Sequence, residues 1–140
     1  MKHRMDELKA VLMVDSHSSV RATYESAFAA AGFLVKTATS GSGAFVALQA
    51  FKPDVVVFDL DTPVPGGMHW LIAARRIPQF EDLPVVVVTA ASPGSLDATA
   101  TQVAQLHGVP HKKSWTPESL VAVARWAAKH RGVTPMVRAA

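Results

Sequence analysis

The sequence predicts an α/β domain: five parallel strands in a doubly wound sheet with helices on both faces, a three-layer αβα sandwich. Two observations carry this prediction. Short apolar runs alternate with segments in which apolar residues recur every three or four positions, the pattern of repeated strand–helix units. Two runs, Val55–Phe58 and Val85–Val88, are apolar throughout, as is typical of strands covered on both faces. These two are expected near the centre of the sheet.

The strands are expected where apolar runs are bounded by turn residues or by the start of a helical pattern. The fifth is much the weakest and is only a short stub. The order is Ala10–Val14, Phe33–Thr37, Val55–Phe58, Val85–Val88 and Val109–Lys112.

The helices are expected between these runs. The first begins at a capping serine and ends before Gly32, the second stops before Lys52 and Pro53, and the last follows Thr116 with a proline in its first turn. The five helices are Ser18–Ala31, Ser42–Phe51, Gly67–Ile77, Leu96–Leu106 and Pro117–Lys129.

Length and composition indicate one domain. The 140 residues contain no cysteine, which excludes disulfide frameworks and thiolate zinc sites. The expected bounds are an N-terminal extension over 1–8, the domain over 9–130 and a C-terminal tail over 131–140. A charged N-terminus without an unbroken apolar stretch does not resemble a signal peptide, so a cytoplasmic location is expected.

The distribution of charge and of apolar residues argues against two classes of partner, nucleic acids and membranes. The net charge is +3, but the basic residues are scattered and form no stripe, so direct nucleic-acid binding is not expected. The longest apolar runs are far shorter than the roughly 20 residues that span a bilayer, so no membrane partner is expected either.

Polar side chains stand at the ends of four expected strands. Ligands of a doubly wound sheet bind at the carboxyl ends of its strands. The residues at these ends are Asp15 and Ser16, Asp59 and Asp61, Thr89, and Lys112 and Lys113. Clustered carboxylates need a cation, and their oxygens suit Mg²⁺. A lysine and a hydroxyl opposite them suit a phosphoryl group.

Four segments together resemble the receiver domain of two-component response regulators, a CheY-like family with a flavodoxin-like fold. They are VLMVDSHSSVR, SGSGAFVALQAFKPDVVVFDLDTPVPGG, PVVVVTAAS and KKSWTPESL, and they span nearly the whole chain. The resemblance implies that Asp59 is the phosphoacceptor, with Pro63 and Gly67 in the following loop. It also implies that Thr89 is the switch hydroxyl and that Lys113 is the lysine that binds the phosphoryl group.

The same resemblance implies a Mg²⁺ site in which Asp15 and Asp59 are ligands and Asp61 offers its backbone carbonyl. The family usually has two adjacent acids after the first strand, and here the second is Ser16, a weak or absent ligand. Mg²⁺ is therefore expected to bind weakly. Asp61 is a further candidate to supply part of the missing charge.

Other departures from the family pattern fall near the fifth strand. Ser114 replaces the usual proline, and no aromatic residue stands at the switch position, for which His111 is the nearest candidate. His111 and Trp115 are expected on the switch surface. A shift of one residue would turn Lys112 instead of Lys113 toward the site.

The function that the resemblance implies is that of a stand-alone receiver. Asp59 would take a phosphoryl group from a histidine kinase or a histidine phosphotransfer protein in a Mg²⁺-dependent reaction. The domain would not be an enzyme beyond its own phosphorylation and dephosphorylation. Output would reach a separate effector protein through the fourth helix, fifth strand and last helix, and a homodimer through this surface is a further expectation.

Two alternatives stay open at this point. One is a degenerate receiver that binds partners without phosphorylation, which Ser16 and Ser114 favour. The other is a haloacid-dehalogenase-type phosphatase with Asp59 as nucleophile and Asp61 as acid/base. That enzyme needs further acids at a later strand end, whereas the only acids after Thr89 lie in helical segments.

Overall fold

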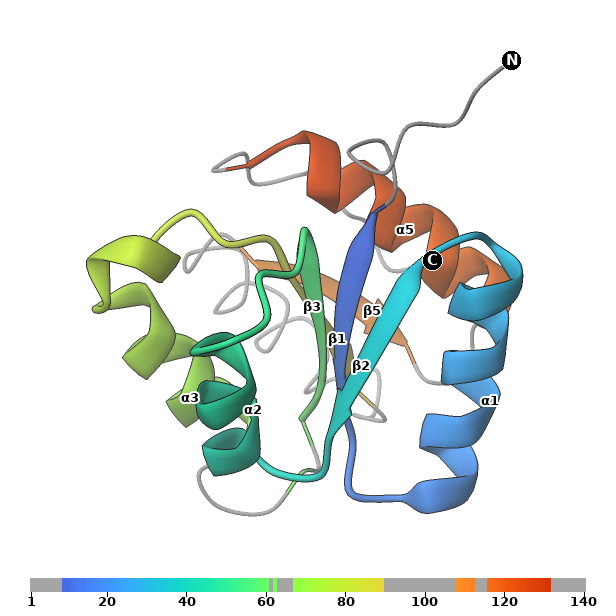
Figure 1. Cartoon of the computed structure of the whole chain (residues 1–140), viewed down its shortest axis with the longest axis horizontal. Helices are drawn as coiled ribbons and strands as arrows, with labels where there is room; N and C mark the ends of the chain where they lie inside the picture. The colour runs from blue at the N-terminus through green and yellow to red at the C-terminus, as the bar shows by residue number, and fades with distance from the viewer. Residues whose placement is uncertain (1–8, 61, 63–66, 90–107, 113–115, 132–140) are drawn as a thin grey trace.

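The strands form one parallel sheet in the order β2-β1-β3-β4-β5, as expected for a doubly wound domain (Figure 1). The computed structural model describes residues 9–60, 62, 67–89, 108–112 and 116–131, with the backbone alone at 89 and 108–112. The strands are β1 (Ala10–Val14), β2 (Leu34–Ala38), β3 (Val55–Asp59), β4 (Val85–Thr89) and β5 (Gly108–Lys112).

The helices cover both faces of this sheet. They are α1 (Ser18–Ala30), α2 (Gly41–Leu48), α3 (Gly67–Arg75) and α5 (Pro117–Lys129), with a short 3₁₀ turn, η2 (Pro78–Phe80). In Figure 1, α1 and α5 lie on one side of the sheet, and α2 and α3 lie on the other. The expected helix Leu96–Leu106 lies outside the described residues. The three-layer arrangement predicted from the sequence is confirmed.

Each face of the sheet has its own apolar core. Val11, Val57 and Phe28 belong to the core beneath α1 and α5, and Leu12 and Phe58 belong to the core beneath α2 and α3. Because successive side chains of a strand point to opposite faces, a continuously apolar strand serves both cores. All five residues of β1 and of β3 are buried.

The predicted central place of the third and fourth strands is confirmed. β3 is the middle strand, between β1 and β4, and both of its pairings are parallel. β2 is an edge strand, and its burial is correspondingly partial.

Several element bounds differ from the prediction. β2 begins at Leu34 because the amide of Phe33 donates to the carbonyl of Phe28 at 3.0 Å and the two rings pack edge to face. The turn before it places Gly32 at a φ of +91°, which a glycine adopts without strain. The N-cap of α1 is His17 and not Ser18, and its side chain makes no capping hydrogen bond.

The second and third helices are shorter than predicted, and the last is as predicted. Ser40 caps α2 by accepting from the amide of Gly43 at 3.0 Å, and this helix ends at Leu48. The third helix ends at Arg75. In α5, Thr116 accepts from the amide of Ser119 at 3.1 Å, and its predicted bounds are confirmed.

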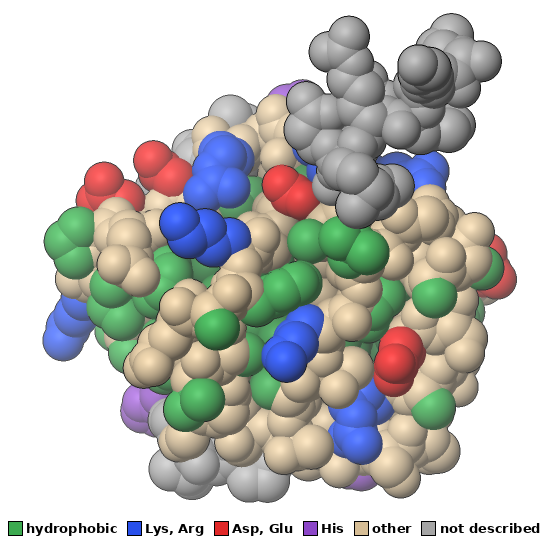
Figure 2. Space-filling view, in the orientation of Figure 1, with side chains coloured by type: hydrophobic (Ala, Val, Ile, Leu, Met, Phe, Trp, Pro, Cys, Tyr) green, Lys and Arg blue, Asp and Glu red, His purple; other side chains and the backbone are tan. Residues whose placement is uncertain are grey.

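The surface is mixed in charge. On the face drawn in Figure 2, the described Lys and Arg side chains are separated by acidic and uncharged ones and do not gather into a stripe. Among the described residues, no helix has the length and apolar character that crossing a bilayer requires.

Candidate functional site

The pairing of β1 with β3 brings two acidic residues together at one end of the sheet. Val14 lies opposite Phe58 in this parallel pair, so the next residues along each strand, Asp15 and Asp59, leave the sheet side by side. Both are buried, with 1% and 2% of their surfaces exposed. The site therefore lies at the carboxyl ends of the strands, the lower edge of the sheet in Figure 1.

Asp15 is held by the turn that leads from β1 into α1. Its Oδ1 accepts from the backbone amide of His17 at 2.8 Å, an Asx-type turn. Its own amide donates to the carbonyl of Ala38 at 3.1 Å, and its carbonyl accepts from Nη1 of Arg21 at 2.8 Å. One carboxylate oxygen is thereby fixed in direction.

His17 joins the two carboxylates. Its Nδ1 lies 3.3 Å from Oδ1 of Asp15 and 3.9 Å from Oδ2 of Asp59. Its side chain is 54% exposed, so the ring lies between the buried acids and the solvent. Sequence reasoning missed this residue. The signal available was its place two residues after Asp15, because an Asx-type turn brings such residues together.

Asp59 is the last residue of the central strand. The amide of Leu60 continues the pairing by donating to the carbonyl of Val88 at 2.9 Å, and the amide of Thr62 donates to the carbonyl of Asp59 at 3.0 Å. The next residue inward, Phe58, stacks on Trp70 of α3 with ring centroids 4.7 Å apart. The strand end is thus held by its neighbour strand, a turn and an aromatic stack.

Trp70 also connects the strand end to α2. Its ring stacks on Phe45 with centroids 5.2 Å apart, and its indole N–H donates to the carbonyl of Gly41 at 3.1 Å. The side chain is fully buried, and its one donor has found a partner.

The remaining residues predicted for the site are placed in part. The backbone register sets Thr89 opposite Lys112 at the ends of β4 and β5, on the edge that carries Asp59. His111 precedes Lys112 in β5, opposite Val88. Ser16 is half-buried between Asp15 and His17. Asp61, Lys113, Ser114 and Trp115 lie outside the described residues, so their predicted roles stay predictions.

The donor set fits a divalent cation. One carboxylate oxygen each from Asp15 and Asp59 and a ring nitrogen of His17 all lie within 4.8 Å of one another. Two buried carboxylates at this separation repel each other unless a positive charge compensates them. Mg²⁺ takes oxygen ligands of this kind, one or two carboxylates with water and phosphate oxygens completing its shell.

Comparison with known proteins identifies the family. The model of the response regulator receiver domain matches residues 11–125. The transcriptional regulatory protein PrrA of Mycobacterium bovis is 37% identical over 82 residues, 59% of this chain and 34% of PrrA. The DNA-binding transcriptional regulator NtrC of Salmonella typhimurium is 36% identical over 96 residues, 68% of this chain and 19% of NtrC. The chain thus spans about a third or less of these two relatives.

Solved structures show the same fold. The chemotaxis response regulator CheY4 of Vibrio cholerae superposes with a TM-score of 0.75 at 26% identity, over 86% of this chain and 98% of that chain. A CheY-like receiver domain protein of Methanospirillum hungatei gives a TM-score of 0.75 at 15% identity, over 87% of this chain and 94% of its own, a likeness of fold alone. The chain therefore belongs to the response regulator receiver domains, the signalling domains of two-component systems.

Proposed function

We propose that Asp59 is the phosphoacceptor of a regulated receiver. One observation carries the proposal: Asp59 ends the central strand as a buried carboxylate, within 4.8 Å of the donor atoms of Asp15 and His17. A carboxylate at the carboxyl end of a central parallel strand is well placed for chemistry with a phosphorylated partner.

The reaction is a phosphoryl transfer from a phosphohistidine of a histidine kinase or a phosphotransfer protein. A carboxylate oxygen of Asp59 attacks phosphorus, the P–N bond of the donor breaks, and the released imidazole nitrogen keeps the electron pair and takes up a proton. The products are an aspartyl phosphate and a neutral histidine. Catalysis of this kind depends mainly on positioning and on charge stabilisation.

Asp15 and Asp59 would hold Mg²⁺, with the backbone carbonyl of Asp61 as a further ligand and Ser16 as a weak one. A bound divalent cation supplies positive charge for the phosphoryl oxygens. Thr89 and a lysine, Lys113 or Lys112, would hold these oxygens after transfer. The site is proposed to bind Mg²⁺ weakly because one carboxylate of the family pattern is replaced by Ser16.

Output is proposed to pass through a surface formed by β5, α5 and the segment before β5. This surface would contact a separate effector protein. Movement of Thr89 toward the new charge would be transmitted to this surface, which includes His111 and Trp115. PrrA and NtrC are named as transcriptional regulators, which supports an effector that controls transcription.

The test is phosphorylation by a small donor. The protein is incubated with acetyl phosphate and Mg²⁺, and intact mass is measured before and after treatment with hydroxylamine, which cleaves acyl phosphates. One phosphoryl mass should appear, and Asp59→Asn should abolish it. Asp54→Asn, at the opposite end of β3, is the matched control and should keep it.

The result that overturns the proposal is a wild-type protein that gains no phosphoryl mass with acetyl phosphate or with a phosphorylated histidine donor. Folding of the sample would be checked by circular dichroism. That outcome would favour the degenerate receiver, a module that binds partners independently of phosphorylation.

A further inference from the structure

We propose that His17 is a metal ligand and that it gives this site a preference for first-row transition ions, such as Zn²⁺ and Co²⁺, over Mg²⁺. The inference deepens the proposed function, because it rests on the same site and names the ion that the site selects. Its basis is the imidazole that the turn after β1 places beside the two buried carboxylates.

The distances fit a single coordination sphere. Zinc binds imidazole nitrogen and carboxylate oxygen at about 2.0–2.2 Å, so two donors of one tetrahedral ion lie roughly 3.3–3.6 Å apart. Nδ1 of His17 lies 3.3 Å from Oδ1 of Asp15 and 3.9 Å from Oδ2 of Asp59. The donor atoms of all three residues lie within 4.8 Å of one another, close to the spacing that one ion requires.

The chemistry of the donors sets the preference. Mg²⁺ strongly favours oxygen ligands, whereas imidazole suits zinc, cobalt and nickel. Ser16 stands where the family usually has an acid, so the set is short of one hard oxygen donor and has gained one nitrogen donor.

The turn prepares the site for binding. The backbone amide of His17 is bonded to Oδ1 of Asp15 at 2.8 Å, which fixes the residue next to the carboxylate. His17 is the N-cap of α1, and its side chain makes no capping hydrogen bond. The ring is therefore not used to cap the start of the helix. With 54% of its side chain exposed, the ring can be reached by an ion from solvent.

The rival explanation is a charged His17 that pairs with both carboxylates and takes the place of a cation. The two explanations predict opposite changes in the affinity for transition ions when the His17 ring is removed. If the ring is a ligand, removing it weakens the binding of transition ions. If the ring is a competing cation, removing it strengthens the binding of every divalent ion, because the carboxylates lose their internal partner.

The experiment is isothermal titration of the full chain with ZnCl₂, CoCl₂ and MgCl₂, without phosphodonor. We expect wild type to bind Zn²⁺ at least about 100-fold more tightly than Mg²⁺, and His17→Gln to lose about tenfold or more for Zn²⁺ with little change for Mg²⁺. His130→Gln removes a histidine at the end of α5, whose ring stacks on Trp126, and should change neither affinity.

A second variant should shift the metal preference from Zn²⁺ toward Mg²⁺. His17→Asp replaces nitrogen by oxygen and should raise Mg²⁺ affinity while lowering Zn²⁺ affinity. Aspartate is favoured at an N-cap, so this variant should fold, which circular dichroism checks. Visible absorption of bound Co²⁺ gives an independent readout, since its bands should shift in His17→Gln.

Equal Zn²⁺ affinities in wild type and His17→Gln, or tighter binding in the variant, would overturn the inference. Its failure is distinct from failure of the proposed function. A protein that is phosphorylated on Asp59 with Mg²⁺ and shows no His17 effect keeps the function and loses the inference. A protein that binds Zn²⁺ through His17 but is never phosphorylated keeps the inference and loses the proposed function.

Discussion

The two ends of β3 each carry an aspartate, and the two carboxylates are used in different ways. Asp54 precedes the strand and Asp59 ends it. Asp54 is half-buried, and its Oδ2 accepts from the amide of Ala10 at 2.7 Å while its own amide donates to the carbonyl of Ala10 at 2.8 Å. It therefore ties β3 to β1, and its carboxylate serves the fold.

Asp59 lies in the opposite situation. It is buried next to a second carboxylate, that of Asp15, and its Oδ2 lies 3.9 Å from Nδ1 of His17. Burying two like charges together costs free energy unless a positive charge compensates them. The same residue type thus joins two strands at one end of β3 and lies beside a second carboxylate at the other end.

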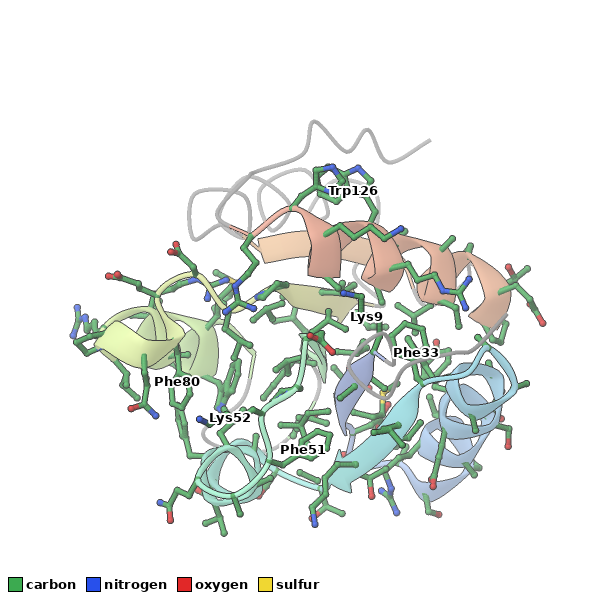
Figure 3. The ribbon with its side chains drawn as sticks, turned by 45° about the horizontal axis from the view of Figure 1, so that its top comes forward. Lys9, Phe33, Phe51, Lys52, Phe80 and Trp126 are labelled. Carbon is green, nitrogen blue, oxygen red and sulfur yellow. The ribbon has the colours of Figure 1, made fainter. Side chains whose placement is uncertain are left out.

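The packing around the two ends differs as well. The amino end opens into a cavity of about 560 Å³, lined in part by Phe51, Lys52 and Phe80. Figure 3 shows these three side chains, which come from the segment after α2 and from η2, on one side of the sheet. The carboxyl end has the buried stack of Phe58 on Trp70 instead. Among the described residues, the buried aromatic stack thus lies at the end for which phosphoryl transfer is proposed.

The largest expected effect is that of Trp70→Ala on stability. The change removes a fully buried ring that stacks on Phe45 and Phe58, so the free energy of unfolding should fall by about 3–5 kcal/mol. Urea unfolding followed by circular dichroism measures it. Phe80→Ala, a half-buried ring at the open end, is the control and should cost far less. Equal losses would contradict the difference in packing between the ends.

A smaller effect of opposite sign is expected for Asp59→Asn in metal-free protein. Two unit charges about 5 Å apart repel by roughly 3 kcal/mol at an effective dielectric constant of about 20. The free energy of unfolding at neutral pH should therefore rise by about 1–3 kcal/mol. Urea unfolding in the presence of a chelator tests this, and a decrease would show that the carboxylate of Asp59 stabilises the fold.

The smallest of the three effects on stability is expected at the amino end of β3. Asp54→Ala leaves the amide of Ala10 without its acceptor, so the free energy of unfolding should fall by about 1–2 kcal/mol. Asp54→Asn keeps an acceptor oxygen and should cost less. Divalent-ion affinity should be unchanged in both variants. If it changed, the two ends of β3 would be coupled more closely than their contacts indicate.

Sequence reasoning located the strands that serve both cores and was less accurate elsewhere. The Val-rich runs of β3 and β4 admit one interpretation, because both faces are apolar. Edge strand β2 has weak alternation, so nothing in its sequence showed that Phe33 would pack on Phe28 instead of joining the strand. The helix α2 ends at Leu48, although Phe51 continues its period and lines the same cavity as Leu48 at the amino end.

The site was predictable to the extent that topology alone determines it. Parallel strands deliver their carboxyl ends to one edge, so Asp15 and Asp59 could be paired from the sequence. The contact of His17 depends on the direction of a side chain in a turn, which hydrophobic periodicity does not encode. A rule that examines residue i+2 after a strand-end aspartate would have found it.

The two edges of the sheet have a consequence for how this molecule behaves when concentrated. β2 and β5 are the edge strands, where unpaired backbone groups invite strands of other molecules. β2 carries the exposed charge of Lys36 at its centre, and β5 carries Pro110, which has no N–H to donate. Lys36 and Pro110 therefore oppose growth of the sheet from chain to chain at both of these edges.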